Sequence, residues 1–258
     1  MGPDGADPGA HADSATDAAA SSSDASDGSP PCLPNDAGFS GALDLTKFIL
    51  AGNAAYGENG DSRITLTDSQ NNQAGAAWYP WLLPAAEGYN LTFSIRVGPN
   101  DTAGDGITFS VLASSGAPPG VGESGDGLGL RNIAANGGGV ASGYAVDVDM
   151  YQDFGDTSDL GPTTFKLLTM PQFKVVAEVV VPSALNDGNV YPVDVSWRPP
   201  SILTATLHGP GTPLTLTSSD PGLKVASSAY IGFTGATGQI ANSHNQVAGA
   251  TVTYTCAP

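Results

Sequence analysis

The chain has 258 residues and a formal net charge of −17, with only eight Lys and Arg residues in total. Proteins that bind DNA, RNA or an anionic membrane surface use clustered cations, so this composition argues against nucleic acid and lipid surfaces as partners. No stretch approaches the roughly 20 consecutive apolar residues that cross a bilayer, and we therefore expect no membrane span.

The first 31 residues differ from the rest of the chain in composition. They consist almost wholly of Ala, Ser, Asp, Gly and Pro, and they contain six Asp but no Lys or Arg. Such a segment cannot bury enough apolar surface to offset the entropy cost of ordering its backbone. We predict a disordered acidic tail or linker over residues 1–31 and a single folded domain over residues 32–258.

The two cysteines, Cys32 and Cys256, lie at opposite ends of the predicted domain. A sandwich brings its ends together, so the two thiols are placed to form a disulfide that clips the termini. The alternative is a pair of unrelated buried thiols. Because a disulfide persists in an oxidising compartment, the pair favours a secreted or cell-surface protein.

From residue 39 onward, short apolar or alternating runs are separated by Gly, Pro, Asn and Asp. Alternation is clearest in the run that places Leu91, Phe93, Ile95 and Val97 on one face of a strand. The predicted strands are 63–67, 89–97, 106–113, 144–150, 173–181, 191–197, 203–207, 214–217, 229–234 and 250–255. Helical stripes and repeats of 20–50 residues are both absent, so we predict an all-β protein, an antiparallel sandwich or barrel.

One acidic residue, Asp105, stands between Gly104 and Gly106 at the mouth of an apolar strand. A carboxylate can accept hydrogen bonds from two neighbouring hydroxyls, and flanking glycines let a ligand approach the backbone closely. A Gly-Asp-Gly run is also common in plain turns, so this segment alone leaves both interpretations open.

A second acidic segment follows the predicted strand that begins at Tyr144. Asp147 and Asp149 are two residues apart in a strand-like run, so both side chains point to the same face. Two neighbouring carboxylates repel unless a cation or a proton neutralises them, and hard divalent ions prefer oxygen ligands. The next acidic residues, in a loop rich in turn formers, are Asp153, Asp156 and Asp159. We predict a cation site here, with a solvated acidic hairpin as the alternative.

Several segments form a pattern when they are taken in chain order. They are Ile64–Thr67 with Gln73–Tyr79, Gly104–Phe109, Gly127–Leu130, Val146–Tyr151 and Tyr230–Gly238. Together they resemble the legume-type (L-type) lectin family, whose fold is the concanavalin A-like jelly-roll. The resemblance implies an antiparallel β-sandwich that binds a glycan or glycoconjugate with the help of Ca²⁺.

The resemblance also implies a set of metal ligands. Calcium would be held by Asp149, the backbone carbonyl of Tyr151, Asp153 and one of Asp156 or Asp159. Asp147 stands where the family places an acidic ligand of a second, transition-metal site. That second site also uses a downstream His, which has no counterpart over residues 163–166. We therefore expect calcium alone.

The implied sugar site combines three parts of the chain with the calcium loop. Its residues would be Asp105 as the sugar-binding carboxylate, the backbone of Gly125, Asp126 and Gly127, the side chain of Asp153, and a specificity loop of Gly235, Ala236, Thr237, Gly238 and Gln239. Plant members of the family have Asn where Asp153 stands. An ionised Asp can only accept hydrogen bonds, so this departure bears on sugar affinity.

Two other functions fit the same architecture. One is a structural or adhesion module that binds no sugar, and the other is a glycoside hydrolase. Hydrolases that resemble laminarinases carry Glu-x-Asp-x-x-Glu on one strand, where this chain has Asp147, Asp149 and Gln152. An amide cannot donate a proton as a general acid, so we predict that the protein is not an enzyme. An oligomer remains compatible with the sequence.

Overall fold

The computed structural model describes most of the predicted domain. The described residues are 41–57, 60–83, 88–99, 104–113, 117–133, 142–151, 160–220, 222–223, 229–239 and 244–255. The predicted tail over residues 1–31 and both cysteines, Cys32 and Cys256, lie outside the described residues. The disordered tail and the disulfide therefore stay predictions.

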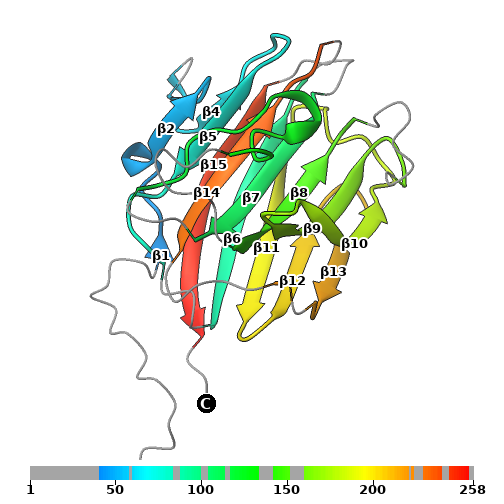
Figure 1. The fold of residues 1–258 in the computed structure, drawn as a ribbon. Coiled ribbons are helices and arrows are strands. Elements are labelled where there is room, and N and C mark those ends of the chain that lie inside the picture. Colours follow the sequence, from blue (N-terminus) through cyan, green and yellow to red (C-terminus); the bar gives the residue numbers. More distant parts are fainter. Residues whose placement is uncertain are drawn as a thin grey trace, which may run out of the picture. The chain divides into compact units, whose positions relative to one another are not determined.

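Two antiparallel sheets form a β-sandwich (Figure 1). The eight-stranded sheet contains, in spatial order, β13 (Leu214–Ser218), β12 (Ile202–Leu207), β11 (Val190–Arg198), β6 (Gly88–Val97), β15 (Asn245–Thr255), β4 (Ile64–Thr67) and β3 (Ala55–Tyr56), with β1 (Gly41–Ala42) paired to β15. The seven-stranded sheet contains β10 (Lys174–Val180), β9 (Thr164–Met170), β8 (Gly143–Asp149), β7 (Gly106–Leu112), β14 (Tyr230–Ala236), β5 (Ala74–Trp78) and β2 (Ile49–Gly52). The predicted fold class is confirmed, and the sandwich rather than the barrel is the architecture.

Helical structure is minor in the part of the chain that the structure describes. It includes two short 3-10 helices, η2 (Leu45–Lys47) and η4 (Gly125–Gly127). Among the described residues, no helix has both the length and the apolar character needed to cross a membrane.

Strand β6 shows how the sequence produces the sandwich. Its buried residues are Tyr89 and the four that alternation placed on one face, Leu91, Phe93, Ile95 and Val97. The residues between them are exposed or half-buried, because this sheet covers the core with one face and meets solvent with the other. The period-2 pattern was therefore a correct guide to this sheet.

Aromatic side chains join the two sheets. The ring of Phe93 on β6 lies 5.1 Å from the ring of Phe233 on β14 and 5.4 Å from that of Phe109 on β7. On the neighbouring strands, Trp197 on β11 stacks on Tyr144 of β8 with ring centroids 5.2 Å apart. Large buried aromatic surfaces therefore hold the sheets face to face.

The seven-stranded sheet is also covered on its second face. A second apolar cluster lies there, to which the segment 117–133 contributes Leu130 and Ile133. The indole N–H of Trp78 on β5 donates to the carbonyl of Gly120 in the same segment at 2.8 Å. Strands β7, β9 and β14 are buried at every position, as expected for strands with packing on both faces.

One glycine in this sheet is required by close packing. A Cβ atom added to Gly232 on β14 would lie 2.2 Å from ring atom Cε3 of Trp78 and 2.7 Å from the carbonyl oxygen of Ala77. Trp78 is fully buried, so its ring has little space into which it could move. Residue 232 therefore has to be a glycine for the two strands to pack as they do.

We expect Gly232→Ala to lower the free energy of unfolding by about 1–3 kcal/mol, because the extra methyl group overpacks the sheet against Trp78. Urea denaturation of the purified chain measures this change. The matched control is Gly209→Ala, whose new methyl would lie at ordinary contact distance, 3.5 Å from Leu185. Equal stability of the two variants would contradict this account.

Candidate functional site

The two acidic segments meet at one end of the seven-stranded sheet. Strands β7 and β8 are paired so that Gly106 lies opposite Asp149. Just beyond this pair, the N–H of Met150 donates to the carbonyl of Asp105 at 2.9 Å. The predicted sugar carboxylate and the predicted calcium ligands are therefore neighbours, although about 40 residues separate them in the sequence.

Asp105 is a buried residue, only 4% exposed. Its carboxylate lies against Gly238, since a Cβ atom added to that glycine would be 3.1 Å from both carboxylate oxygens. The predicted specificity loop thus covers the predicted sugar carboxylate directly. A side chain at position 238 would crowd this carboxylate, which is why a glycine suits that position.

Thr237 anchors the specificity loop, which runs from Gly235 to Gln239. Its hydroxyl donates to the carbonyl of Gln70 at 2.6 Å and accepts from the N–H of Gln73 at 3.0 Å. Its own backbone N–H donates to the carbonyl of Gln73 at 2.9 Å. The loop is therefore fixed to the hairpin between β4 and β5.

Further contacts hold the rest of the loop. The N–H of Asn72 donates to the carbonyl of Gly238 at 3.0 Å, and the side chain of Asn71 donates to the carbonyl of Gln239. The amide of Asn245 on β15 donates to the carbonyl of Ala236 at 3.0 Å. Because backbone carbonyls are bound on both sides of Thr237, the loop is ordered before any ligand arrives.

The predicted backbone donors of residues 125–127 form the short helix η4, next to this loop. The N–H of Gly125 donates to the carbonyl of Thr237 at 3.3 Å. The carboxylate of Asp126 is paired with the guanidinium of Arg131, which also lies over the ring of Phe173 at 4.9 Å. The structure thus brings all three predicted parts of the sugar site together, with the Asp126 side chain turned to Arg131.

The predicted calcium ligands lie partly inside the described residues. Oδ1 of Asp149 accepts the N–H of Tyr151 at 3.1 Å, so these two residues form a tight turn at the end of β8. Asp153, Asp156 and Asp159 lie outside the described residues. Among the residues that are described, no group of three or more His, Cys, Asp and Glu side chains is placed to hold a metal ion.

A lysine ammonium that was not predicted from the sequence lies beside Asp149. The ammonium Nζ of Lys166 on β9 lies 2.7 Å from Oδ2 of Asp149 and 3.9 Å from Oε1 of Glu178 on β10. Lys166 is only 6% exposed. A lysine among the apolar residues of β9 indicated a buried cation. Its partners could not be predicted, because they depend on the strand register, which the sequence does not give.

Donor chemistry separates the two metals that the resemblance implies. The carboxylate of Asp149 and the carbonyl of Tyr151 are hard oxygen ligands, which suit Ca²⁺. Zn²⁺, Cu²⁺, Ni²⁺ and Fe²⁺ prefer imidazole or thiolate, whereas Mn²⁺ also accepts carboxylate oxygens. The described histidines are His208 and His244, at the ends of β12 and β15, and neither is on β8, β9 or β10. The oxygens of Asp149 and Tyr151 thus have the donor chemistry that Ca²⁺ prefers, and the described part of β8, β9 and β10 offers no imidazole.

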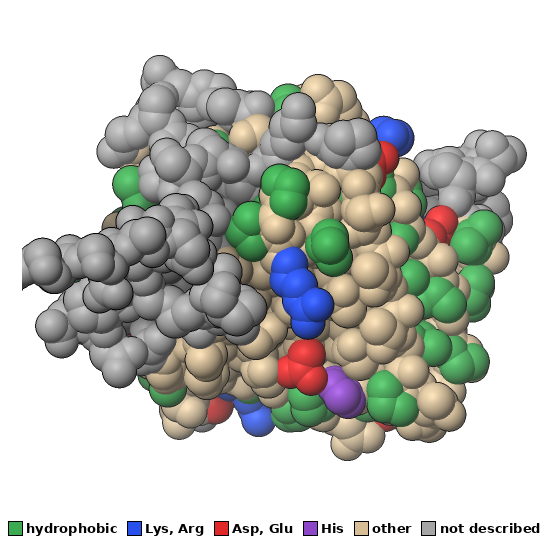
Figure 2. Space-filling model, turned by 90° about the horizontal axis from the view of Figure 1, so that it is seen from below, with side chains coloured by type: hydrophobic (Ala, Val, Ile, Leu, Met, Phe, Trp, Pro, Cys, Tyr) green, Lys and Arg blue, Asp and Glu red, His purple; other side chains and the backbone are tan. Residues whose placement is uncertain are grey.

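Cations are sparse on the surface. On the face drawn in Figure 2, the described Lys and Arg side chains are scattered rather than gathered over one element. This distribution agrees with the exclusion of nucleic acid and anionic lipid, and it leaves neutral ligands as the better partners.

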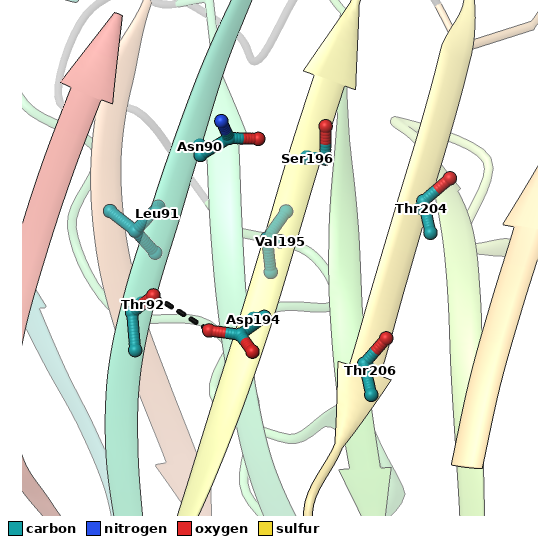
Figure 3. Close-up of a pocket in the computed structure, with 8 residues that line it drawn as sticks. All are labelled: Asn90, Leu91, Thr92, Asp194, Val195, Ser196, Thr204 and Thr206. Carbon is teal, nitrogen blue, oxygen red and sulfur yellow. Dashed lines mark hydrogen bonds between the residues drawn. The ribbon is translucent and has the colours of Figure 1, made fainter. Parts of the chain in front are cut away.

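A separate depression of about 240 Å³ lies on the outer face of the eight-stranded sheet (Figure 3). It is lined by Asn90, Leu91, Thr92, Asp194, Val195, Ser196, Thr204 and Thr206. Asp194 accepts from the hydroxyl of Thr92 at 2.6 Å, and His208 lies 2.7 Å from its other carboxylate oxygen. These polar groups bind one another, and the depression is on the opposite sheet from the site that contains Asp105.

Comparison with known proteins identifies related sequences and folds. Residues 37–255 match the legume lectin domain family. Similar solved structures include lectin I-B4 from Griffonia simplicifolia in its metal-free form, with 18% identity, coverage of 81% of this chain and 94% of that chain, and a TM-score of 0.67. Basic winged bean lectin with Tn-antigen has 20% identity, coverage of 85% and 98%, and a TM-score of 0.67. Lectin I from Ulex europaeus with the methyl glycoside of α-L-fucose has 20% identity, coverage of 83% and 95%, and a TM-score of 0.66.

We expect Thr237→Val to lower the free energy of unfolding by about 1–3 kcal/mol, because the N–H of Gln73 loses its acceptor in a buried position. Hydrogen exchange should also become faster over residues 235–239. The control is Thr253→Val on β15, an exposed residue, which should change stability by less than about 0.5 kcal/mol. A loop that exchanges equally slowly in both variants would show that Thr237 is not its anchor.

Proposed function

Because the chain belongs to the legume lectin domain family, we propose that it is a calcium-dependent carbohydrate-binding protein with its site at Asp105. The site lies where the ends of β7, β8 and β14 meet the short helix η4. The ligand is a glycan or glycoconjugate, whose neutral hydroxyls suit a surface with few cations. A binding role, without catalysis, rests on the family to which the chain belongs.

The observation that carries this proposal is the hydrogen bond from the N–H of Met150 to the carbonyl of Asp105, at 2.9 Å. It ties the residue between the two proposed calcium ligands, Asp149 and Tyr151, to the backbone of the proposed sugar carboxylate. An ion that fixes the end of β8 therefore also fixes the position of Asp105. Binding sites held in place before the ligand arrives lose less entropy on binding.

Different parts of the chain have different roles in sugar binding. Asp105 accepts hydrogen bonds from sugar hydroxyls through its carboxylate. The N–H groups of Asp126 and Gly127 donate to the ligand, since the N–H of Gly125 is already bound to Thr237. The loop of residues 235–239 limits which sugar fits.

Calcium would be held by Asp149 and the carbonyl of Tyr151, with Asp153 and one of Asp156 or Asp159. When bound, the ion supplies positive charge that neutralises these carboxylates and fixes the loop after β8. Asp153 stands where plant members have an amide, so in this chain that position accepts hydrogen bonds and donates none.

The burial of Asp105 favours one alternative function. A residue that is only 4% exposed offers little surface to a ligand, as expected of a structural or adhesion sandwich that binds no sugar. The two functions differ in a simple measurement, because a structural module would tolerate the loss of this carboxylate's charge.

We also infer that the protein works outside the cytoplasm, in a secreted or cell-surface form. This inference is supported by the proposed Cys32–Cys256 disulfide, which needs an oxidising compartment. Association into oligomers is compatible with the solvent-facing outer side of the eight-stranded sheet.

We expect a glycan array with 1 mM Ca²⁺ to reveal at least one bound sugar, and Asp105→Asn to weaken that binding by about tenfold or more, because a charged acceptor is lost. The control is Asp194→Asn, the same change on the opposite sheet, which should bind normally. Wild-type binding that survives in Asp105→Asn would remove Asp105 from the site. An array with no bound sugar would favour the structural module.

Calcium should raise the stability of the wild-type chain. A site of micromolar affinity at millimolar Ca²⁺ adds about 4 kcal/mol, measured as the difference between thermal unfolding in Ca²⁺ and in excess chelator. Asp149→Asn should abolish this difference, whereas Tyr151→Phe should keep it, because Tyr151 contributes only its backbone carbonyl. If chelator leaves the wild-type melting temperature unchanged, the calcium site does not exist.

A further inference from the structure

Three charged residues form a row across adjacent strands of the seven-stranded sheet. The register places Asp147 on β8 opposite Lys166 on β9, and Lys166 opposite Glu178 on β10. Directly opposed residues in antiparallel strands point to the same face, so the three side chains lie side by side. Asp149, two residues further along β8, points to this face as well and receives the ammonium of Lys166 at 2.7 Å.

The ammonium of Lys166 is a buried cation at the centre of a carboxylate cluster. The side chains of Lys166, Glu178 and Asp149 are 8%, 9% and 15% exposed, and Asp147 is 1% exposed as a residue. Removing a charge from water costs several kcal/mol unless opposite charges lie close by. The carboxylates therefore stabilise the ammonium, and the ammonium in turn offsets the repulsion among them.

A transition-metal ion at the same place would compete with this ammonium. Such an ion binds a carboxylate oxygen at about 2.0–2.2 Å, so an ion on Oδ2 of Asp149 would lie within about 5 Å of Nζ of Lys166. The two cations would repel across a buried, weakly screened space. The residue opposite Asp149 on β9 is Thr164, so without the ammonium the ligands at this place would be carboxylates, which suit Mn²⁺.

We propose that the ammonium of Lys166 takes the place of a transition-metal ion, cross-linking Asp149 and Glu178 from within the chain, so that the protein binds no transition metal at this position. Lys166 is a positioning residue: by holding Oδ2 of Asp149, it leaves Oδ1 directed toward the turn at Tyr151. The ammonium belongs to the chain itself, so these ion pairs do not depend on the metal concentration. Calcium would then be the single bound ion, a conclusion that depends on the proposed function.

The test compares Mn²⁺ binding by wild type, Lys166→Met and Lys174→Met, measured by electron paramagnetic resonance and by thermal unfolding. Lys174 provides the matched control, because it lies on the neighbouring strand β10 with its side chain 63% exposed and paired to Asp220. Wild type and Lys174→Met should bind no Mn²⁺ at saturating Ca²⁺. Lys166→Met should bind about one Mn²⁺ per chain under the same conditions, with its melting temperature raised by roughly 5 °C or more.

Lys166→Arg, which keeps the positive charge, should behave as wild type does. If Lys166→Met folds only when Mn²⁺ is present, the ion has replaced the ammonium and the proposal is supported. A Mn²⁺ site in wild type that persists at saturating Ca²⁺ would overturn it. So would a Lys166→Met variant that gains no site, whether it is folded or remains unfolded with Mn²⁺. These outcomes are independent of calcium binding by wild type, which tests the proposed function separately.

Discussion

The seven-stranded sheet is buried on both faces, and the arrangement of polar groups in this protein follows from that constraint. Water cannot reach the middle of β7, β8, β9 and β14, so each polar side chain there needs a protein partner. Thr108 and Thr234 meet at 2.6 Å, and Thr234 donates onward to the carbonyl of Leu128 in the covering segment at 2.7 Å. In the same register row, Lys166 lies among the carboxylates. One row of side chains thus passes from hydroxyls on β14 and β7 to charges on β8, β9 and β10.

The candidate binding site lies where this buried pairing ends. At the last pair of β7 and β8, the chain leaves the sheet through Asp105 on one strand and Asp149 on the next, and the ladder gives way to turns. The loop of residues 235–239 and the helix η4 come to the same end from β14 and the covering segment. Inside the sheet, polar groups have to bind one another. At this end they are available to a ligand, so the rigid sheet positions a binding site that is made of loops.

Much of this structure could be predicted from the sequence, for reasons that particular residues make clear. Alternation over residues 91–97 identified the buried face of β6, and the spacing of Asp147 and Asp149 correctly indicated a shared face. The order of short motifs led to the family. The ion pair of Lys166 with Asp149 could not be predicted, because it depends on which residues face each other across β8 and β9. The burial of Asp105 was also unforeseen, since it results from Gly238, more than 130 residues away.

Strand β15 has a consequence for how the chain folds. It is the last strand in sequence, yet it lies in the interior of the eight-stranded sheet, between β6 and β4, and it also pairs with β1. While the chain is being synthesised, β6 and β4 therefore expose unpaired edges until residues 245–255 have emerged. Contacts between segments so distant in sequence are slow to form, and open strand edges invite pairing with other chains. This topology therefore favours folding to completion after synthesis, with a chaperone shielding those edges.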